Sequence, residues 1–428
     1  MASLRRGHSR VRVACVSQAE PAPVARSGAL RARPVRRAPA LPPASQLRYV
    51  TWLLCLAVVL ALLVACHASA AQALAVSVSG NRLVDEAGET VVLRGANTSG
   101  SEYACVSEHA IFDGDEEASA ASIAAMRRWG FNVARVQLNE SCWLGVQGVK
   151  PAYSGLAYQH AIEQYVNALN AAGMYVIVSL HFSSKGGRAK ATGQVPMPDE
   201  RYAPFFWSSV AEAFKGNRAV IFDLFNEPYP NRNSDSEAAW QCVLEGSAGG
   251  HCKGFSYAAA GMQQLLDAVR ATGAQNVVLA GGPQYAGVLD GWLRFAPVDP
   301  LGQLAASIHI YWHNAAHPEW SPCYASSCWQ SQLLPLARRV PVVIGEFGEL
   351  DCGDTMFPPL LALADENGIS YLAWAWFVGS CKGEPSLIKS YSGTPTAYGI
   401  GYLQHLEALG LAGEGASGFD EAPVGDLP

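Results

Sequence analysis

Short runs of apolar residues recur along the chain, separated by longer stretches in which apolar residues return every three or four positions. The short runs are rich in Val, Ile and aromatic residues and are typical of buried strands, whereas the longer spacing is typical of helices that cover a core. We predict eight strands, at 91–97, 133–138, 175–181, 220–227, 277–282, 305–311, 340–346 and 370–377. Helices are predicted between them, at 118–129, 158–172, 203–214, 257–271 and 357–367.

The alternation of strands and helices predicts an α/β fold, a (β/α)8 TIM barrel. Two short alternating stretches between residues 75 and 93 predict a small β-hairpin before the first barrel strand. A doubly wound open sheet is the alternative, but no G-x-G-x-x-G sequence follows the first strand, as it would in a dinucleotide-binding sheet. We therefore expect one barrel domain at 74–411, followed by a disordered tail at 412–428 that is rich in Gly, Ala, Pro and acids.

Residues 1–73 differ in composition from the rest of the chain. Ten Arg and one acid lie within 1–48, and an apolar run and small residues follow up to Ala73 without any charge. This order is typical of a secretory signal peptide, so we expect cleavage after Ala73 and a secreted protein. Two alternatives stay open, a membrane anchor formed by the 50–66 segment and lipidation at Cys66.

The charge of the chain argues against one class of partner. Half of the residues are hydrophobic and 15% are charged, so the chain can bury a large core. Beyond residue 73 there are 20 basic and 35 acidic residues. So acidic a domain should repel a polyanion, and we expect no nucleic-acid binding.

Cysteine usage agrees with export. Eight of the eleven cysteines lie beyond residue 73, an even number that predicts disulfides in an oxidising compartment: Cys105, Cys142, Cys242, Cys252, Cys323, Cys328, Cys352 and Cys381. Because no two are spaced as C-x2-C, we expect no metal site, and no cofactor is expected either.

The barrel topology also predicts how these cysteines pair. Loops after successive strands are neighbours at one end of a barrel, which brings a cysteine after the first strand close to one after the second. The same argument applies to the loops after the seventh and eighth strands, and the remaining two pairs lie within single loops. The expected bridges are Cys105–Cys142, Cys352–Cys381, Cys242–Cys252 and Cys323–Cys328.

Polar and aromatic side chains end or lie within the apolar strands, at Arg135, His181, Asn226, Glu227, His309, Tyr311, Glu346, Trp374 and Trp376. The chemistry of a (β/α)8 barrel takes place at the C-terminal ends of its strands. Since a buried ionisable group is costly, its presence at the end of an apolar strand indicates a function. In contrast, we expect Glu349 and Asp351 to be solvated loop acids, and Lys185 and Arg188 to be solvated as well.

Glu227 and Glu346 end the fourth and seventh strands, which lie on opposing sides of a barrel. Two carboxylates that face one cavity are what glycoside hydrolysis requires, because one protonates the leaving oxygen and the other attacks the anomeric carbon. A structural salt bridge is the alternative for either residue alone. Together with the other strand-end groups, the pair favours catalysis.

Three segments on the fourth, sixth and seventh strands resemble the motifs of glycoside hydrolase family 5, the cellulase-like retaining β-glycosidases. They are Phe225-Asn226-Glu227-Pro228, His309-Ile310-Tyr311 and Ile344-Gly345-Glu346-Phe347-Gly348. The resemblance extends from about Leu93 to about Tyr402. It implies a barrel that hydrolyses β-linked glycans with retention of configuration.

The resemblance also implies roles for individual residues. Glu227 would be the acid/base and Glu346 the nucleophile, while Asn226 would donate a hydrogen bond to the sugar 2-hydroxyl. Arg135 and Tyr311 would keep the nucleophile ionised.

The rest of the set would bind the reacting sugar. By the resemblance, His181 and His309 would line its subsite, and a tryptophan would form the platform beneath it. Trp374 and Trp376 are both candidates for that platform, with Trp374 preferred.

The leading hypothesis is a secreted, monomeric endo-β-1,4-glucanase that acts on a β-linked polysaccharide or oligosaccharide. A β-mannanase, a xyloglucanase and a β-1,3-glucanase are alternatives within the same chemistry. A non-catalytic sugar-binding barrel is disfavoured because both glutamates are present.

Overall fold

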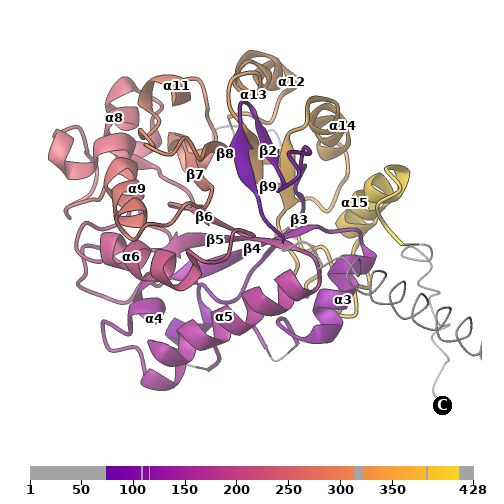
Figure 1. Ribbon diagram of the computed structural model, residues 1–428, viewed down its shortest axis with the longest axis horizontal. Coiled ribbons are helices and arrows are strands. Elements are labelled where there is room, and N and C mark those ends of the chain that lie inside the picture. Colours follow the sequence, from indigo (N-terminus) through magenta and orange to yellow (C-terminus); the bar gives the residue numbers. More distant parts are fainter. Residues whose placement is uncertain (1–73, 108, 115, 313–321, 382–383, 414–428) are drawn as a thin grey trace, which may run out of the picture. The chain divides into compact units, whose positions relative to one another are not determined.

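The computed structural model describes residues 74–107, 109–114, 116–312, 322–381 and 384–413. Within them, eight parallel strands close into a barrel in the order β10-β3-β4-β5-β6-β7-β8-β9 (Figure 1). Their bounds are β3 Arg94–Thr98, β4 Val133–Asn139, β5 Tyr175–Phe182, β6 Val220–Asp223, β7 Val278–Gly281, β8 Leu304–Trp312, β9 Val342–Glu349 and β10 Ser370–Ala373. The predicted (β/α)8 barrel is confirmed, and the open-sheet alternative is excluded.

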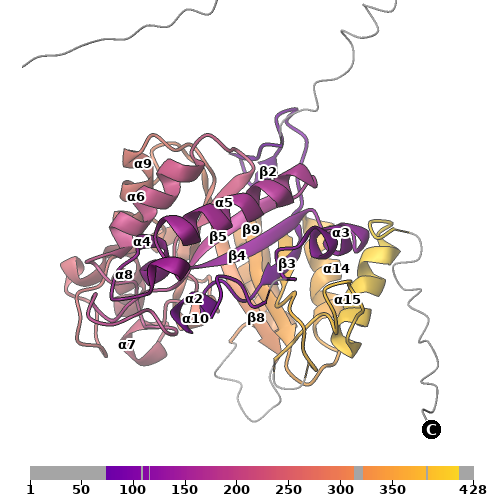
Figure 2. The same cartoon turned by 90° about the horizontal axis from the view of Figure 1, so that it is seen from below.

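Helices and helical turns connect successive strands and cover the barrel (Figures 1 and 2). On the first half of the barrel they are α2 Ala104–Ser107, α3 Ala120–Arg128, α4 Glu140–Leu144, η1 Pro151–Tyr153, α5 Leu156–Ala171, α6 Ala203–Phe214, α7 Pro230–Asn233, α8 Glu237–Glu245 and η2 Gly246–Gly249. On the second half they are α9 Met262–Ala271, α10 Pro283–Ala286, α11 Trp292–Phe295, α12 Ser326–Cys328, η4 Trp329–Leu333, α13 Leu334–Ala337, α14 Phe357–Asn367 and α15 Ala397–Ala408.

A short hairpin closes the N-terminal end of the barrel, as the sequence predicts. Strands β1 (Ser77–Ser79) and β2 (Arg82–Val84) pair antiparallel, and Leu83 packs with inward-facing barrel residues such as Val133 and Ile177 in a core of their own. Figure 2 shows the hairpin at one end of the barrel and α7 and α10 toward the other. The opposite end, where the strands finish, is therefore the one left to form a site.

Two strands end four residues earlier than predicted. β6 ends at Asp223 and β10 at Ala373, because the backbone beyond them leaves the parallel ladder; the Asn226 N–H, for example, donates to the carbonyl of Leu180. As a result, Glu227 and Trp374 lie in the first residues of loops and not within strands.

Four disulfides tie the chain together, and they are the pairs that the loop order predicts: Cys105–Cys142, Cys242–Cys252, Cys323–Cys328 and Cys352–Cys381. The first and last close segments of 37 and 29 residues. In the chain-entropy account each of these two stabilises the fold by about 3–4 kcal/mol.

The expectations for residues 1–73, Cys66 included, and for the tail beyond Gly413 concern parts of the chain outside those described. Among the described helices, none combines the length and apolar character needed to cross a bilayer.

Candidate active site

A hollow of about 430 Å³ opens at the C-terminal end of the barrel. The ends of several strands and the loops that follow them supply its walls, and most of the lining residues are polar or aromatic. They are His181, Gln194, Glu227, Tyr285, Tyr311, Glu346, Leu350, Trp374, Glu384 and Pro385. Five of the predicted site residues thus line one cavity, as expected of a binding site.

The two glutamates of the sequence prediction face each other across His309. One ligand atom from each of Glu227, His309 and Glu346 lies within 4.8 Å of the other two. His309 Nδ1 lies 2.9 Å from Glu227 Oε1 and 3.6 Å from Glu346 Oε2. β8 and β9 pair so that His309 and Glu346 are directly opposite in register, which fixes this arrangement from the backbone.

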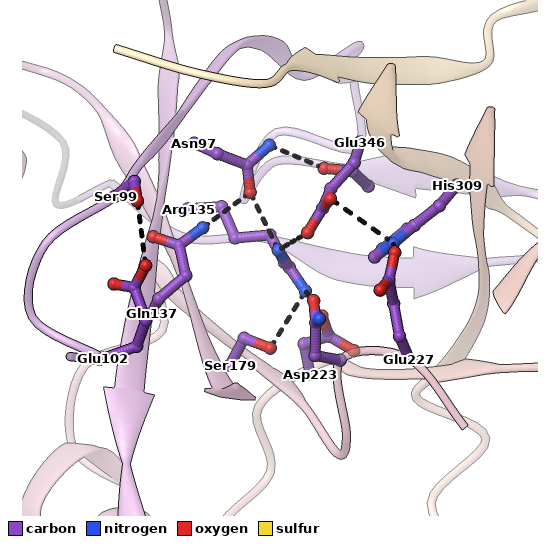
Figure 3. A network of polar contacts seen from close by, with 12 residues as sticks. Asn97, Ser99, Glu102, Arg135, Gln137, Ser179, Asp223, Glu227, His309 and Glu346 are labelled. Atoms are coloured by element: carbon purple, nitrogen blue, oxygen red, sulfur yellow. Dashed lines mark hydrogen bonds and ion pairs between the residues drawn. The ribbon is translucent and has the colours of Figure 1, made fainter. Parts of the chain in front are cut away.

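Arg135, fully buried on β4, binds two acids at once (Figure 3). Its Nη1 donates to Glu346 Oε1 at 2.7 Å, while Nε and Nη2 both donate to Asp223 Oδ2, at 2.9 and 2.7 Å. Asp223 was not among the predicted site residues, although a charged residue inside the apolar run 220–225 was a signal for it. A buried arginine needs such partners because an unpaired buried charge is strongly destabilising.

The remaining donors of Arg135 hold three polar residues in place. Nη1 also donates to Asn97 Oδ1, and Nη2 donates to Ser179 Oγ and to Asn226 Oδ1. With its carbonyl oxygen engaged in this way, Asn226 keeps its Nδ2 group buried and without an acceptor among the described residues. That amide is therefore available as a donor to a ligand hydroxyl.

Glu346 is surrounded by groups that favour its ionised form. In addition to Arg135, the Tyr311 hydroxyl donates to Glu346 Oε2 at 2.6 Å. Burial raises the pKa of Glu346 above its ordinary value, and the charge of Arg135 and the hydrogen bond from Tyr311 oppose that rise. The donor set suits a carboxylate that must be negative when it reacts.

Glu227 lacks such a counter-ion. Burial raises its pKa to about 7, opposed by a hydrogen bond that Gln194 Nε2 donates to Oε2. The side chain is 11% exposed and reaches the hollow. Glu227 thus keeps a proton near neutral pH, which suits a general acid. Gln194, 33 residues earlier in the chain, was not predicted, because it lies in a loop without any periodic pattern.

Both histidines of the site, His181 and His309, are neutral near pH 7. Burial lowers the pKa of His309 to about 4 and that of His181 well below its ordinary value. The His181 ring stacks nearly parallel to Trp374, with 5.6 Å between centroids. Both rings line the hollow and give it an aromatic wall.

Trp376, the second candidate for the sugar platform, does not reach the hollow, and its prediction as a binding residue is wrong. Its side chain is fully buried, donates from Nε1 to Ser122 Oγ at 3.0 Å and packs edge-on against Trp129. β10 ends at Ala373, so the rule that residues two apart share a face of a strand no longer holds there.

Glu349 is also corrected, because it is fully buried at the end of β9. Its carboxylate accepts hydrogen bonds from the backbone N–H groups of Thr355, Met356 and Phe357, just before and at the start of α14. The role is structural, since these groups have no partner within the helix. Asp351 is exposed, as expected.

Within the described residues, Glu227, His309 and Glu346 are the one group whose atoms are close enough to share a metal ion. Both oxygens of each glutamate are already engaged, by His309 and Gln194 on one side and by Arg135 and Tyr311 on the other. The cation nearest to Glu346 is thus a guanidinium. The arrangement is suited to proton transfer and nucleophilic attack at a carbon atom.

Residues 84–380 match the model of the cellulase family, glycosyl hydrolase family 5. The chain belongs to glycosyl hydrolase family 5. In this family 5 protein, the segments that suggested the resemblance are the ones that supply Glu227, Tyr311 and Glu346 to the cavity.

Relatives of this family 5 chain include an endoglucanase of Bacillus sp. (strain KSM-635), 26% identical over 56% of this chain and 22% of the relative. A manganese-dependent endoglucanase of Phanerodontia chrysosporium is 23% identical over 54% of this chain and 57% of the relative. A mannan endo-1,4-β-mannosidase of Streptomyces lividans is 25% identical over 70% of this chain and 66% of the relative. The chain thus spans less than two thirds of the length of each of these relatives.

Solved structures share the barrel of this family 5 protein. A β-glucanase of Saccharophagus degradans superposes with a TM-score of 0.59 at 19% identity, covering 78% of this chain and 94% of that one. An endocellulase of the archaeon Pyrococcus horikoshii gives 0.58 at 19% identity, over 79% and 99%. At such identities the likeness concerns the fold.

Proposed function

We propose that this protein is an endo-β-1,4-glucanase that works with retention of configuration. The observation that carries the proposal is the distance between Glu227 and Glu346, because a carboxylate oxygen of one lies within 4.8 Å of a carboxylate oxygen of the other. Carboxyl groups of retaining glycosidases are about 5–5.5 Å apart, whereas inverting enzymes leave about 6.5–9.5 Å for a water molecule. The different surroundings of the two acids support one role for each.

In the first step, a Glu346 oxygen forms a bond to the anomeric carbon while the bond from that carbon to the glycosidic oxygen breaks. Glu227 gives its proton to the departing oxygen, and its pKa of about 7 keeps that proton available. The free amide group of Asn226 is placed to donate to a sugar hydroxyl during this step.

In the second step, Glu227 is a carboxylate and takes a proton from water. The resulting hydroxyl attacks the anomeric carbon, and the bond between that carbon and Glu346 breaks. Two inversions give net retention. The His181–Trp374 wall provides a flat face for the C–H side of the pyranose in both steps.

The names of the relatives support β-1,4-glucan as substrate, since two of those above are endoglucanases. The Streptomyces relative covers more of this chain and acts on mannan, so β-mannan is the second candidate. Xyloglucan and β-1,3-glucan are the remaining candidates from the sequence.

A reducing-sugar assay on hydroxyethylcellulose, glucomannan, xyloglucan and laminarin tests the substrate. We expect the fastest release of reducing sugar from hydroxyethylcellulose. The variant Glu346→Gln should release none above background from any of the four polymers. Proton NMR of the first product formed from a cello-oligosaccharide tests retention. An initial α-anomer, or the absence of release from every polymer, would contradict the proposal.

We also propose that the chain is exported. Four disulfides in one domain support an oxidising compartment. Expression with residues 1–73 intact, followed by sequencing of the N-terminus of secreted protein, tests export and the cleavage after Ala73. A protein that is found in the membrane fraction of the cells, and not in the medium, would favour the anchored or lipidated form. Gel filtration tests the expected monomer.

A further inference from the structure

A second hollow, of about 340 Å³, lies on the same end of the barrel as the catalytic one. Two cations and three aromatic rings dominate its walls. The lining residues are Lys185, Arg188, Pro196, Tyr229, Gly254, Phe255, Ser256 and Tyr257. No acid is among the residues that line it, although acids outnumber bases in the domain.

One wall separates this hollow from the catalytic one. Tyr229, two residues after Glu227, stacks on Tyr285 with 4.5 Å between ring centroids, and Tyr285 lines the catalytic hollow. The Tyr229 hydroxyl also donates to the carbonyl of Gln194, whose amide holds Glu227. The second hollow therefore lies beyond the acid/base, on the side where the leaving group departs.

The two cations of the second hollow form no ion pair within the part of the chain that the structure describes. Lys185 and Arg188 are exposed, and neither has an ion-pair or hydrogen-bond partner for its side chain among the described residues. In contrast, Arg94, Arg135 and Arg270 are each paired with an aspartate. The unpaired charges at one hollow are thus free to bind a ligand.

The loop that carries them is held in a defined path. Gly186 and Gly187 both have positive φ angles, of 68° and 71°. A Cβ atom at Gly186 would lie 2.6 Å from the Cβ of Tyr257, so only glycine lets the loop approach that residue. The Tyr257 hydroxyl donates to the carbonyl of Met197 at 2.7 Å, which fixes the ring against this path.

We propose that the second hollow is a leaving-group subsite for a carboxylate-bearing sugar unit of the β-glycan, such as a uronic acid. The inference rests on the proposed function and adds a substrate class to it. Tyr229, Phe255 and Tyr257 offer apolar faces to the pyranose C–H groups. Arg188 can bind the carboxylate with two parallel hydrogen bonds, and Lys185 adds a second positive charge.

The kinetic test compares an acidic with a neutral soluble glucan, carboxymethylcellulose and hydroxyethylcellulose. We expect the double variant Lys185→Gln/Arg188→Gln to lower the ratio of kcat/KM for the acidic over the neutral polymer about five- to tenfold, which is about 1–1.4 kcal/mol for two exposed ion pairs together. The difference in this ratio between the wild-type protein and the double variant should vanish at high salt. An unchanged ratio would overturn the subsite.

Arg338→Gln/Arg339→Gln is the matched control. It removes the same charge from two exposed arginines just before β9, at the end of the barrel that the hairpin closes. This variant should leave the ratio unchanged. An equal fall in both variants would show that overall charge, and not the hollow, controls the preference.

A binding experiment separates this inference from the proposed function, because it needs no turnover. We expect cellobiouronic acid to bind the wild-type protein more tightly than cellobiose in isothermal titration, and the double variant to lose that preference. Equal affinities, or no binding of either disaccharide, would overturn the subsite even if hydroxyethylcellulose is hydrolysed. If neither polymer is hydrolysed but the preference is found, the subsite stands and the proposed function falls.

Discussion

Replacing Tyr311 by Phe should move the acid side of the pH–activity profile. The Tyr311 hydroxyl donates to Glu346 Oε2 at 2.6 Å and lowers the pKa of that carboxyl. The phenol itself stays protonated, because burial raises its own pKa well above the ordinary value. The substitution removes one oxygen and leaves the ring, so the carboxylate loses a donor with little change in packing.

The size of the effect follows from the strength of that bond. A hydrogen bond to a charged group contributes about 1.5–3 kcal/mol, and one pKa unit corresponds to about 1.4 kcal/mol. The pKa of Glu346 should therefore rise by about one to two units. Since Glu346 must be ionised to attack, the acid limb of kcat/KM moves to higher pH by that amount.

The alkaline limb should stay in place, because Glu227 sets it near pH 7. The profile becomes narrower and its maximum lower, since the two apparent pKa values of the pair approach each other. The measurement is kcat/KM for hydroxyethylcellulose from pH 3 to 9.

Tyr398→Phe is the control, because it removes a buried hydroxyl that donates at 3.0 Å to a backbone carbonyl, that of Phe347. An unmoved acid limb in Tyr311→Phe would refute the reasoning, and so would the same shift in the control. A shift of the alkaline limb alone would assign the nucleophile to Glu227 instead.

Three further changes test other parts of the site. Glu346→Gly should abolish hydrolysis, while azide should restore cleavage of an activated substrate and give the α-azide; a β-azide would make Glu346 the acid/base. Gln194→Leu should raise the alkaline limb by about half a pH unit, because Glu227 loses a partly exposed donor to its carboxylate; a fall would contradict this. Glu349→Ala should lower the free energy of unfolding by about 1–3 kcal/mol in urea titration without moving either limb; a moved limb would place Glu349 in the chemistry.

The sequence predicted the barrel and much of the site because both leave local signals. A parallel strand buried on both faces is a continuous apolar run, so an ionisable residue at its end, such as Glu346, stands out. The disulfides followed from the order of the loops alone. Asp223 carries the same signal, but it lies inside its run just before the Asn226–Glu227 pair and was missed, although Arg135, in the same kind of position, was predicted.

Other errors concern positions beyond the regular elements. Trp376 was assigned by strand periodicity, which stops at Ala373. Glu349 was placed in a loop, whereas β9 extends to that residue and the start of α14 folds back onto its carboxylate. Gln194 reaches Glu227 only through the path of a long loop. Such contacts depend on tertiary structure, and no spacing within the sequence encodes them.

The pairing of Arg135 with two acids has a consequence for charge during the proposed reaction. When Glu346 becomes an ester of the sugar, it loses its negative charge. If Glu346 were the only acid bound to Arg135, the arginine would then be an unpaired cation in the barrel interior. Moving it to solvent, or bringing another anion to it, would slow the catalytic cycle. Because Asp223 holds the other side of the guanidinium, the group stays neutralised in place. The group formed by Arg135, Asp223 and Glu346 thus alternates between one net negative charge and none, and never becomes positive.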